Sequence, residues 1–431
     1  MDSQFYTMAP TKNPQLKYIK IGEVLHSSQY GISIEMNEDG RGYPIYRMNE
    51  LHDMLCDIEV NKHADITIDE YKRFALKNRD VLFNRTNSYE WVGRTGIYYQ
   101  NDNVERTFAS YLVRLNPVES VILPEYLCTF LNTKQGHLDI KRRARQSINQ
   151  TNVNPEEVKE IEIPILSLAF QTKIKECFEA ANNCRVKSLL LYKEAVHYLE
   201  KYLLPNGWHP SNKQTNVKSL KESFLSSGRL DAEHYQVKYD ELEAKIKAVP
   251  HKTIAEIQQF NARGVQPDYV EGGSVSVVNS KHILEDGLDY ENFERTTHTF
   301  LSTHKRAQIG YGDILVYTTG ANIGRTQVYL RENHALASNH VNILRVQGVN
   351  PIYLALVLNS PIGRMQTEKL CTGSAQAELY PFDIEKFIVP ILPETVQKSI
   401  AAKVQESFSL KAESHRLLEE AKLMVEMEIE K

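Results

Sequence analysis

The sequence has little of several features that would quickly assign it to a class of protein. Its five cysteines form no CxxC pair and leave an odd count, which argues against a disulfide framework and against a structural zinc site. No apolar run is long enough to span a membrane, and residues 1–12 resemble neither a signal peptide nor a transit helix. With 42% hydrophobic and 25% charged residues, the chain is expected to be globular and cytoplasmic.

Signatures of catalysis are also missing. The sequence holds no glycine-rich phosphate loop, no GxSxG or HExxH motif, no EF-hand pattern and no NPP[FYW] tetrapeptide of the kind that amino-methyltransferases use. The formal net charge is −4, whereas a protein that binds nucleic acid through its bulk charge is basic. We therefore expect no catalytic and no metal site, and any DNA binding has to come from local patches or from a partner.

What the sequence does have is an internal repeat, which relates residues 20–204 to residues 253–431. The offset between matched positions falls gradually along the chain, as small loop deletions would produce, whereas chance matches would scatter. The matched pairs include Asp80–Leu82 with Asp313–Leu315, Gly93–Thr95 with Gly324–Thr326, Pro124–Thr133 with Pro351–Ser360, and Ile163–Leu166 with Val389–Leu392.

Each half has the pattern of a mainly-β module. Val81–Phe83 and Gly96–Tyr99 are short apolar runs on either side of a polar segment, which predicts two paired strands joined by a long loop. Ile314–Tyr317 and Thr326–Tyr329 repeat this arrangement in the second half. We therefore expect one such strand pair in each module.

Short helices are expected after these strands. Proline favours the first turn of a helix, so one helix should begin at Pro124 and its counterpart at Pro351. Gly136 and Gly363 would then lie near the ends of the two helices. A further helix, without an equivalent before the first module, is predicted over Asp231–Lys247 with Asp231 as its N-cap.

Long amphipathic helices close the two modules. Apolar residues advance by threes and fours from Phe170 to Leu203, and again over residues 394–431. A helix with one apolar face needs a partner, and the obvious partner is its own repeat. The expected fold is α+β, with two mainly-β domains separated by a pair of long antiparallel, coiled-coil-like helices and related by a pseudo-two-fold internal repeat.

The polar loops between the paired strands supply the first candidate DNA contacts. In the major groove arginine suits guanine and asparagine suits adenine, while serine and threonine adapt to bases or phosphates. The loop recurs with a different set of side chains in each half, which favours DNA reading over an ordinary solvated hairpin tip. The candidates are Arg85, Thr86, Asn87, Ser88 and Arg94, and in the second half Thr318, Thr319, Asn322 and Arg325.

A basic run and its counterpart supply the second set of candidates. Four positive charges between Lys141 and Arg145 would neutralise several phosphates and steer association. The alternative is that the run only caps the preceding helix, whose end favours cations. We favour DNA contact in the first half, although the second half lacks the charges. The candidates are Arg142, Arg143, Arg145, Gln146 and Asn149, then Thr372, Ser374 and Gln376, with Asn339 in addition.

Taken in order, these motifs resemble the specificity subunit of type I restriction-modification enzymes. The shared features are a D-[IV]-L strand, a polar loop closing on G-[RK]-T, a G-S-x-Q-like loop, and a proline-bearing strand that leads into a long helix with a glutamine. Arg229–Tyr235 is similar to the family too. One departure is that Arg79 stands where the second half has Gly312. The motifs here are Asp80–Leu82, Gly93–Thr95, Gln146–Asn149, Val158–Ile165 and Gln171, then Asp313–Leu315, Gly324–Thr326, Gly373–Gln376, Ile384–Ile391 and Gln397.

The resemblance implies a non-catalytic subunit in which each module reads one half of a bipartite, asymmetric, gapped site in double-stranded DNA. The paired helices would fix the gap and bind DNA methyltransferase subunits, expected to be two, and through them the motor and nuclease (restriction) subunits. S-adenosylmethionine, ATP and Mg²⁺ are expected on those partners; none is expected in this chain, and no membrane partner is expected. The implied parts are target-recognition domains at 1–165 and 251–393, spacer helices at 166–205 and 394–431, and a linker with a connecting helix at 206–250.

Two other functions stay open at this point. The specificity subunit of a motor-less, type II-like restriction-modification system would have the same sequence features. In a coiled-coil adaptor, by contrast, the helices bind proteins and the modules never touch DNA. Replacing Arg85 and Asn87 with alanine would leave an adaptor active, whereas a DNA reader would lose about 1–3 kcal/mol per bidentate contact.

Overall fold

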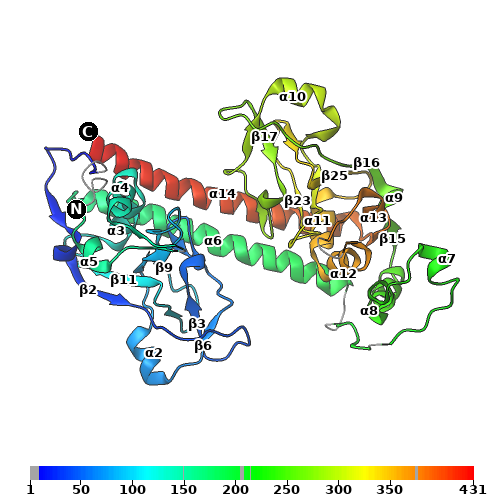
Figure 1. Ribbon diagram of the computed structural model, residues 1–431, viewed down its shortest axis with the longest axis horizontal. Helices are drawn as coiled ribbons and strands as arrows, with labels where there is room; N and C mark the ends of the chain where they lie inside the picture. The colour runs from blue at the N-terminus through cyan, green and yellow to red at the C-terminus, as the bar shows by residue number, and fades with distance from the viewer. Residues whose placement is uncertain (1–8, 149, 204–207, 214, 374–376) are drawn as a thin grey trace. The chain divides into compact units, whose positions relative to one another are not determined.

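The structure, a computed structural model, describes residues 9–148, 150–203, 208–213, 215–373 and 377–431. Contacts within the chain divide it into two units: unit 1 is Met1–Lys187 with Leu410–Lys431, and unit 2 is Ser188–Ser409. The two predicted long helices are confirmed as α6 (Leu168–Leu203) and α14 (Glu394–Glu430), and each of them contributes one part to each unit (Figure 1).

Unit 1 is built on a six-stranded sheet in the order β2-β11-β7-β9-β5-β4. The predicted strand pair is confirmed, because β7 and β9 are antiparallel neighbours in which Val81 lies opposite Ile97. The side chains of Val81 to Phe83 are fully buried, so this pair forms the centre of the core. The strands are β2 (Leu25–Tyr30), β4 (Leu51–His52), β5 (Leu55–Cys56), β7 (Asp80–Asn84), β9 (Thr95–Tyr98) and β11 (Leu112–Pro117).

Smaller sheets and short helices complete unit 1. One sheet pairs β1 with β14, and another has the order β10-β3-β6. Their strands are β1 (Tyr18–Lys20), β3 (Tyr43–Tyr46), β6 (His63–Ala64), β10 (Thr107–Phe108) and β14 (Glu162–Pro164). The helices are α2 (Ile68–Phe74), α3 (Pro124–Asn132), α4 (Lys134–Arg143) and α5 (Pro155–Lys159).

Unit 2 contains two four-stranded sheets, in the orders β16-β25-β22-β23 and β20-β17-β24-β21. The predicted pair is again confirmed, because β22 and β23 are antiparallel neighbours. The first sheet comprises β16 (Gln258–Arg263), β22 (Ile314–Tyr317), β23 (Thr326–Val328) and β25 (Val341–Val346). The second comprises β17 (Val275–Val278), β20 (Glu294–Thr296), β21 (Gln308–Ile309) and β24 (Ala335–Ala337).

Two strand pairs and several helices surround these sheets in unit 2. The pairs are β15 (His251–Thr253) with β26 (Ile388–Pro390), and β18 (Ile283–Leu284) with β19 (Gly287–Leu288). The helices are α7 (Phe224–Ser227), α8 (Val237–Lys247), α9 (Ile254–Ile257), α10 (His298–Thr303), α11 (Pro351–Asn359), α12 (Pro361–Leu370) and α13 (Pro381–Ile384). Among the described helices of the chain, none combines the length and the apolarity that a membrane crossing requires.

The internal repeat extends to individual hydrogen bonds. In unit 1 the buried Gln171 side chain, on the first turn of α6, accepts a hydrogen bond from the N–H of Leu123 at 2.7 Å. In unit 2 Gln397, near the start of α14, accepts one from the N–H of Asn350 at 2.9 Å. Each glutamine ties a long helix to the residue that precedes α3 or α11. The same internal bond therefore joins helix and domain in both copies.

The long helices pair antiparallel within each unit. In unit 2 the hydroxyl of Ser188 donates to the carbonyl of Ser407 at 2.8 Å, while Glu194, further along α6, pairs with Lys403, which lies earlier in α14. In unit 1 the apolar faces of both helices join the core of the domain. The helix residues in that core are Ile174, Phe178 and Ala181 of α6, and Leu418, Ala421, Val425 and Ile429 of α14.

The sequence predicted that Gly136 and Gly363 lie near the ends of the helices that begin at Pro124 and Pro351. The structure places both glycines in the helices that follow. They lie in the first turn of α4 and α12, which follow α3 and α11 almost at once. A Cβ on Gly136 would lie 2.1 Å from the carbonyl oxygen of Phe130, and one on Gly363 would lie 2.1 Å from that of Leu358. Glycine is needed at both positions because the two helices of each pair approach so closely.

The connecting helix is shorter than predicted. α8 begins at Val237, and the 3-10 helix η3 (Ala232–Tyr235) precedes it. Asp231 makes no capping hydrogen bond, because its carboxylate binds the guanidinium of Arg229. Part of the predicted linker lies outside the described residues. The division of the chain into five parts stays a prediction.

Candidate nucleic-acid interface

The structure brings the two predicted DNA-contacting segments of the first module together. They form a three-stranded antiparallel sheet in the order β12-β13-β8, which consists of Arg145–Gln146, Thr151–Asn152 and Thr86–Asn87. In its register Gln146 lies opposite Thr151, and Thr151 lies opposite Asn87. Residues about sixty positions apart thus share one small sheet.

The second module joins its two predicted segments through Glu378. Isolated β-bridges pair this residue with Thr319, from the first predicted loop, and with Thr372, from the second. The N–H of Leu379 also donates to the carbonyl of Thr318 at 2.9 Å. Although the intervening Gly373–Ala377 loop is only partly described, both units place the same two segments side by side.

Arg85 directly precedes β8 of this three-stranded sheet and is a well-placed cation beside it. Its backbone is fixed, because its N–H donates to the carbonyl of Tyr111 and its carbonyl accepts from the N–H of Val153. Its guanidinium lies 5.2 Å from the centre of the Tyr30 ring, which is half exposed. Among the described residues no carboxylate lies within ion-pair distance of this guanidinium. Arg85 therefore offers an unneutralised, aromatic-supported cation to an anion or a guanine edge.

Four further predicted residues of this sheet have accessible side chains. Arg145 is 82% exposed and lies 4.0 Å from Glu157, so its charge faces solvent. Gln146 and Ser88 are exposed, and Asn87 is partly exposed, with its side-chain oxygen accepting from the N–H of Ser88 at 2.8 Å. Amide, hydroxyl and guanidinium groups are the types that read base edges and phosphates.

Three predicted threonines shape the loops and do not face solvent. Thr86 is buried and donates its hydroxyl to the side chain of Asn152 at 2.6 Å. Thr318 is fully buried and donates its hydroxyl to the carbonyl of His340 at 2.9 Å. Thr319 is buried too. These three side chains are buried within their loops, and direct contact of Thr86, Thr318 and Thr319 with DNA stays a prediction.

The predicted basic run is mostly engaged within the protein. Arg142 and Arg143 both bind the carboxylate of Asp139, one helical turn earlier, and their side chains are nearly buried. Lys141 donates to the carbonyl of Val92 at 2.9 Å and also to that of Tyr89, and burial lowers its pKa to about 8. These three cations are engaged within the protein, and their contact with DNA stays a prediction.

The arginines of the repeated G-R-T motif differ between the units. Arg94 stacks on Trp91, with its guanidinium carbon 3.5 Å from the ring centre, and burial lowers its pKa. Among the described residues no carboxylate forms an ion pair with it. Arg325 instead lies 3.5 Å from the carboxylate of Glu285, which Arg364 also approaches. Arg94 keeps an uncompensated charge, whereas that of Arg325 is neutralised.

The remaining predicted residues of unit 2 form a smaller accessible set. Thr372 is exposed, and Asn322 and Asn339 are partly exposed. Three further candidates, Asn149 of unit 1 with Ser374 and Gln376 of unit 2, lie outside the described residues.

Exposed aromatic residues beside cations are the feature that the sequence reasoning missed. In unit 1 they are Tyr30, Tyr89 and Trp91, each with a cation over its ring. In unit 2 Arg263 lies 4.5 Å from the centre of the Tyr380 ring, and Tyr380 stacks on Phe382. In residues 85–94 Tyr89 and Trp91 stand between Arg85 and Arg94, and that combination of aromatic and basic residues could have identified Trp91.

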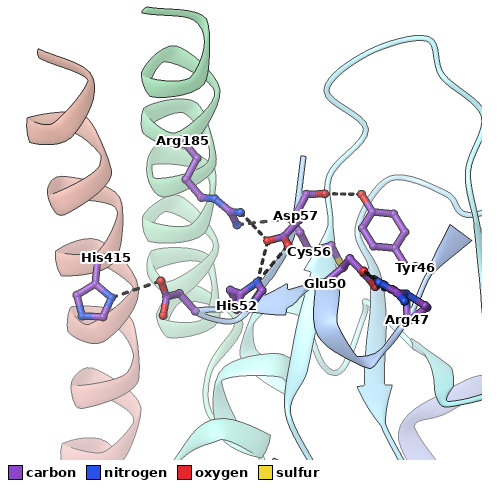
Figure 2. Close-up of polar contacts among 9 residues, drawn as sticks. Tyr46, Arg47, Glu50, His52, Cys56, Asp57, Arg185 and His415 are labelled. Atoms are coloured by element: carbon purple, nitrogen blue, oxygen red, sulfur yellow. Dashed lines mark hydrogen bonds and ion pairs between the residues drawn. The ribbon is translucent and has the colours of Figure 1, made fainter. Parts of the chain in front are cut away.

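A polar cluster fastens the β4–β5 hairpin of unit 1 to both long helices (Figure 2). His415 of α14 lies 3.6 Å from the carboxylate of Asp53, and Arg185 of α6 lies 3.3 Å from that of Asp57. The turn itself puts Asp53 and Met54 at positive φ, 48° and 61°, where glycine is usual. Burial raises the pKa of Asp53, but His415 and Arg185 outweigh it and hold that pKa below its usual range.

Comparison with known proteins supports the resemblance found in the sequence. Residues 15–188 match the family model described as "Type I restriction modification DNA specificity domain". The chain is 25% identical over 211 residues to the type I restriction enzyme MjaX specificity subunit of Methanocaldococcus jannaschii, a match that covers 48% of this chain and 49% of that protein. It is 23% identical over 181 residues to the EcoKI specificity subunit of Escherichia coli, covering 42% and 37% respectively.

These matches are partial, because the chain spans about half the length of the curated relatives, or less. A solved structure described as a type I restriction-modification system S subunit from M. genitalium aligns over 97% of this chain and 98% of its own, with 14% identity and a TM-score of 0.45. The family match covers most of unit 1, including the sheet that contains Arg145 and is directly preceded at β8 by Arg85. Residues 15–188 are therefore similar to a type I restriction-modification DNA specificity domain, and about half of the chain is similar to specificity subunits of that family.

Proposed function

We propose that the chain is the sequence-specific DNA-recognition subunit of a type I restriction-modification complex. One observation carries the proposal: each unit assembles two separate polar segments into one surface, and the two surfaces present different side chains. Unit 1 presents Arg85, Asn87, Arg145 and Gln146, whereas unit 2 presents neutral groups such as Thr372 and Asn322. Two unlike surfaces on one repeated scaffold suit a bipartite, asymmetric site.

Two kinds of binding follow from this proposal. The recognition surfaces contact the two halves of a gapped site in double-stranded DNA, and the helix pair fixes the gap. The same helices carry DNA methyltransferase subunits, two in number, and through them the motor and nuclease subunits. S-adenosylmethionine, ATP and Mg²⁺ belong to those partners, and this chain contributes recognition and no catalytic group.

The small number of cations in the predicted DNA-contacting segments is consistent with a complex in which partner subunits also contact the DNA. The chain carries a net charge of −4, and three of the four cations in its basic run are used internally. Phosphate contacts account for most of the salt-dependent affinity of DNA-binding proteins. A chain with few free cations therefore needs partners to supply much of the phosphate-binding surface, so we expect the isolated chain to bind DNA weakly.

Methylation mapping of the host genome tests the proposal. Single-molecule sequencing of hosts with and without the gene should show one gapped adenine-methylation motif that depends on it. The double variant Arg85→Ala/Asn87→Ala should relax one half of that motif and leave the other half unchanged. Arg41→Ala, at an exposed arginine outside the predicted DNA-contacting segments, is the matched control. Methylation that is identical in all four hosts would contradict the proposal and favour an adaptor that never touches DNA.

A further inference from the structure

A buried ion pair occupies one corner of unit 1. The guanidinium of Arg79 donates two hydrogen bonds to the carboxylate of Glu125, each 2.7 Å long, and a third to Glu119 at 2.7 Å. The hydroxyl of Tyr99 donates to the same Glu125 carboxylate at 3.1 Å. Glu125 is completely buried, on the first turn of α3. The Arg79 side chain thus fills the space beside the start of that helix.

Unit 2 has none of these three groups at the equivalent positions. Gly312 precedes Asp313 as Arg79 precedes Asp80, and both residues have a positive φ, of 85° and 70° respectively. Ile352 is the second residue of α11, as Glu125 is of α3. Leu330 follows Tyr329, the counterpart of Tyr98, as Tyr99 follows Tyr98. The polar trio of unit 1 is therefore replaced by a glycine and two apolar residues.

The consequence is a hollow in unit 2 of about 350 Å³. Gly312, Leu330 and Ile352 line one part of it, and Ala401 and Ala402 of α14 line another. A Cβ built on Gly312 would meet nothing within 4 Å, so the space begins directly at the backbone. This open hollow is far larger than one water needs, and the larger part of its lining is apolar.

The charged groups around this place differ between the units. In unit 1 two carboxylates, those of Glu125 and Glu119, receive the guanidinium of Arg79. In unit 2 no carboxylate is among the described residues that line the hollow, and the lining charge is the ammonium group of Lys398. Lys398 pairs with Glu394 at 2.6 Å, but both side chains are largely exposed, so this pair exchanges easily with solvent or with a partner. An apolar group flanked by a carboxylate complements such a wall and rim.

We propose that this hollow receives an apolar side chain, flanked by an acidic residue, from one methyltransferase subunit. The proposal rests on the function proposed above, and the wall that α14 supplies makes the hollow continuous with the helix surface assigned there to the methyltransferase. The half-exposed Tyr311 at the edge is of the residue type that is enriched at protein interfaces. Since Arg79 fills the equivalent place in unit 1, only unit 2 offers this contact. The two methyltransferase subunits therefore bind unequally.

A filled-hollow variant tests this asymmetry. Ala402 is exposed, so Ala402→Phe fills the hollow from the helix side without disturbing the core. The matched control is Ala248→Phe, at an exposed alanine that follows α8 in the same unit and outside the hollow. Titration of the full-length chain with its methyltransferase, followed by native mass spectrometry, counts the copies bound and gives both dissociation constants. For Ala402→Phe we expect one copy to bind at least tenfold more weakly and the other to keep its affinity.

A second variant fills the hollow with the groups that unit 1 already uses. Gly312→Arg/Leu330→Tyr/Ile352→Glu transplants the trio, and the positive φ of Arg79 shows that arginine is accepted in this backbone conformation. This variant should weaken the same single copy as Ala402→Phe does. Unchanged affinities in both variants, or an equal loss for both copies, would overturn the docking site. A wild-type chain that binds no methyltransferase at all would instead refute the proposed function.

Discussion

Removing Arg79 should be among the most damaging single substitutions in unit 1. Arg79→Gly suits the positive φ of this position, so backbone strain does not complicate its effect. The change leaves the carboxylate of Glu125, which is completely buried, with only the Tyr99 hydroxyl as a side-chain partner. Breaking a buried ion pair by removing one partner costs about 3–5 kcal/mol. Because Tyr99 still donates, we expect a loss of about 3 kcal/mol in the free energy of unfolding.

The structure also supplies a compensating substitution. Glu125→Ile together with Arg79→Gly reproduces the pair found in unit 2, in which no charge remains buried. Replacing a buried ion pair by apolar groups is often nearly neutral, so the double variant should be more stable than Arg79→Gly alone. The resulting double-mutant cycle should give a coupling energy of about 2 kcal/mol or more.

The measurement has to separate unit 1 from unit 2, and the two tryptophans allow this. Trp91 lies in unit 1 and Trp208 in unit 2, so Trp208→Phe leaves a fluorescence reporter for unit 1 alone. Urea unfolding of the four variants in this background gives each free energy. A cost below about 1 kcal/mol for Arg79→Gly, typical of a surface ion pair, would refute the reasoning. A coupling energy near zero would do the same.

Three further predictions concern charge, pH and loop structure. Arg145→Ala should reduce the slope of log affinity against log salt by about 1, which DNA titrations at several salt concentrations would measure. Arg143→Ala should leave that slope unchanged but lower the free energy of unfolding, which urea unfolding would measure. Burial and two nearby lysines lower the pKa of His137 to about 4, so the unfolded chain binds a proton that the folded chain does not between about pH 6.5 and pH 4. Stability should therefore fall as the pH drops through this window, by up to about 3 kcal/mol, and unfolding curves of His137→Gln should show a smaller fall. Thr318→Val removes a buried hydroxyl that donates to the carbonyl of His340, whereas the N–H of residue 318 still donates to that carbonyl. The temperature midpoint of unit 2 should therefore drop by an amount equivalent to about 0.5–1.5 kcal/mol.

Much of the fold follows from local patterns in the sequence. Short runs of three or four residues around polar loops identified the two strand pairs. The three-four periodicity identified α6 and α14 to within two residues of their boundaries. Such signals depend on residues close in sequence, so one sequence suffices to read them. The repeat added strength, because each pattern occurs twice.

The candidate site was harder to predict, because its geometry depends on residues far apart in the chain. The ring under Arg85 belongs to Tyr30, on another strand, and no local pattern indicates that contact. The ion pairs of Arg142 and Arg143 were easier to predict. Asp139 lies three and four positions earlier on the same helix, and side chains at these spacings meet. Weighing that spacing would have favoured the helix-end alternative for both arginines.

The G-R-T motif shows how a repeated scaffold can acquire two different surfaces. In both units the glycine N–H donates back to the preceding strand at 2.8 Å, and the threonine hydroxyl, on Thr95 or Thr326, donates to the glycine carbonyl. The backbone of the loop is thus held in the same way twice. Between those fixed points Arg94 stacks on Trp91, whereas Arg325 pairs with Glu285. Because the hydrogen bonds shared by the two loops involve the backbone and the threonine, the neighbouring side chains can differ, and one fold can present two unlike surfaces.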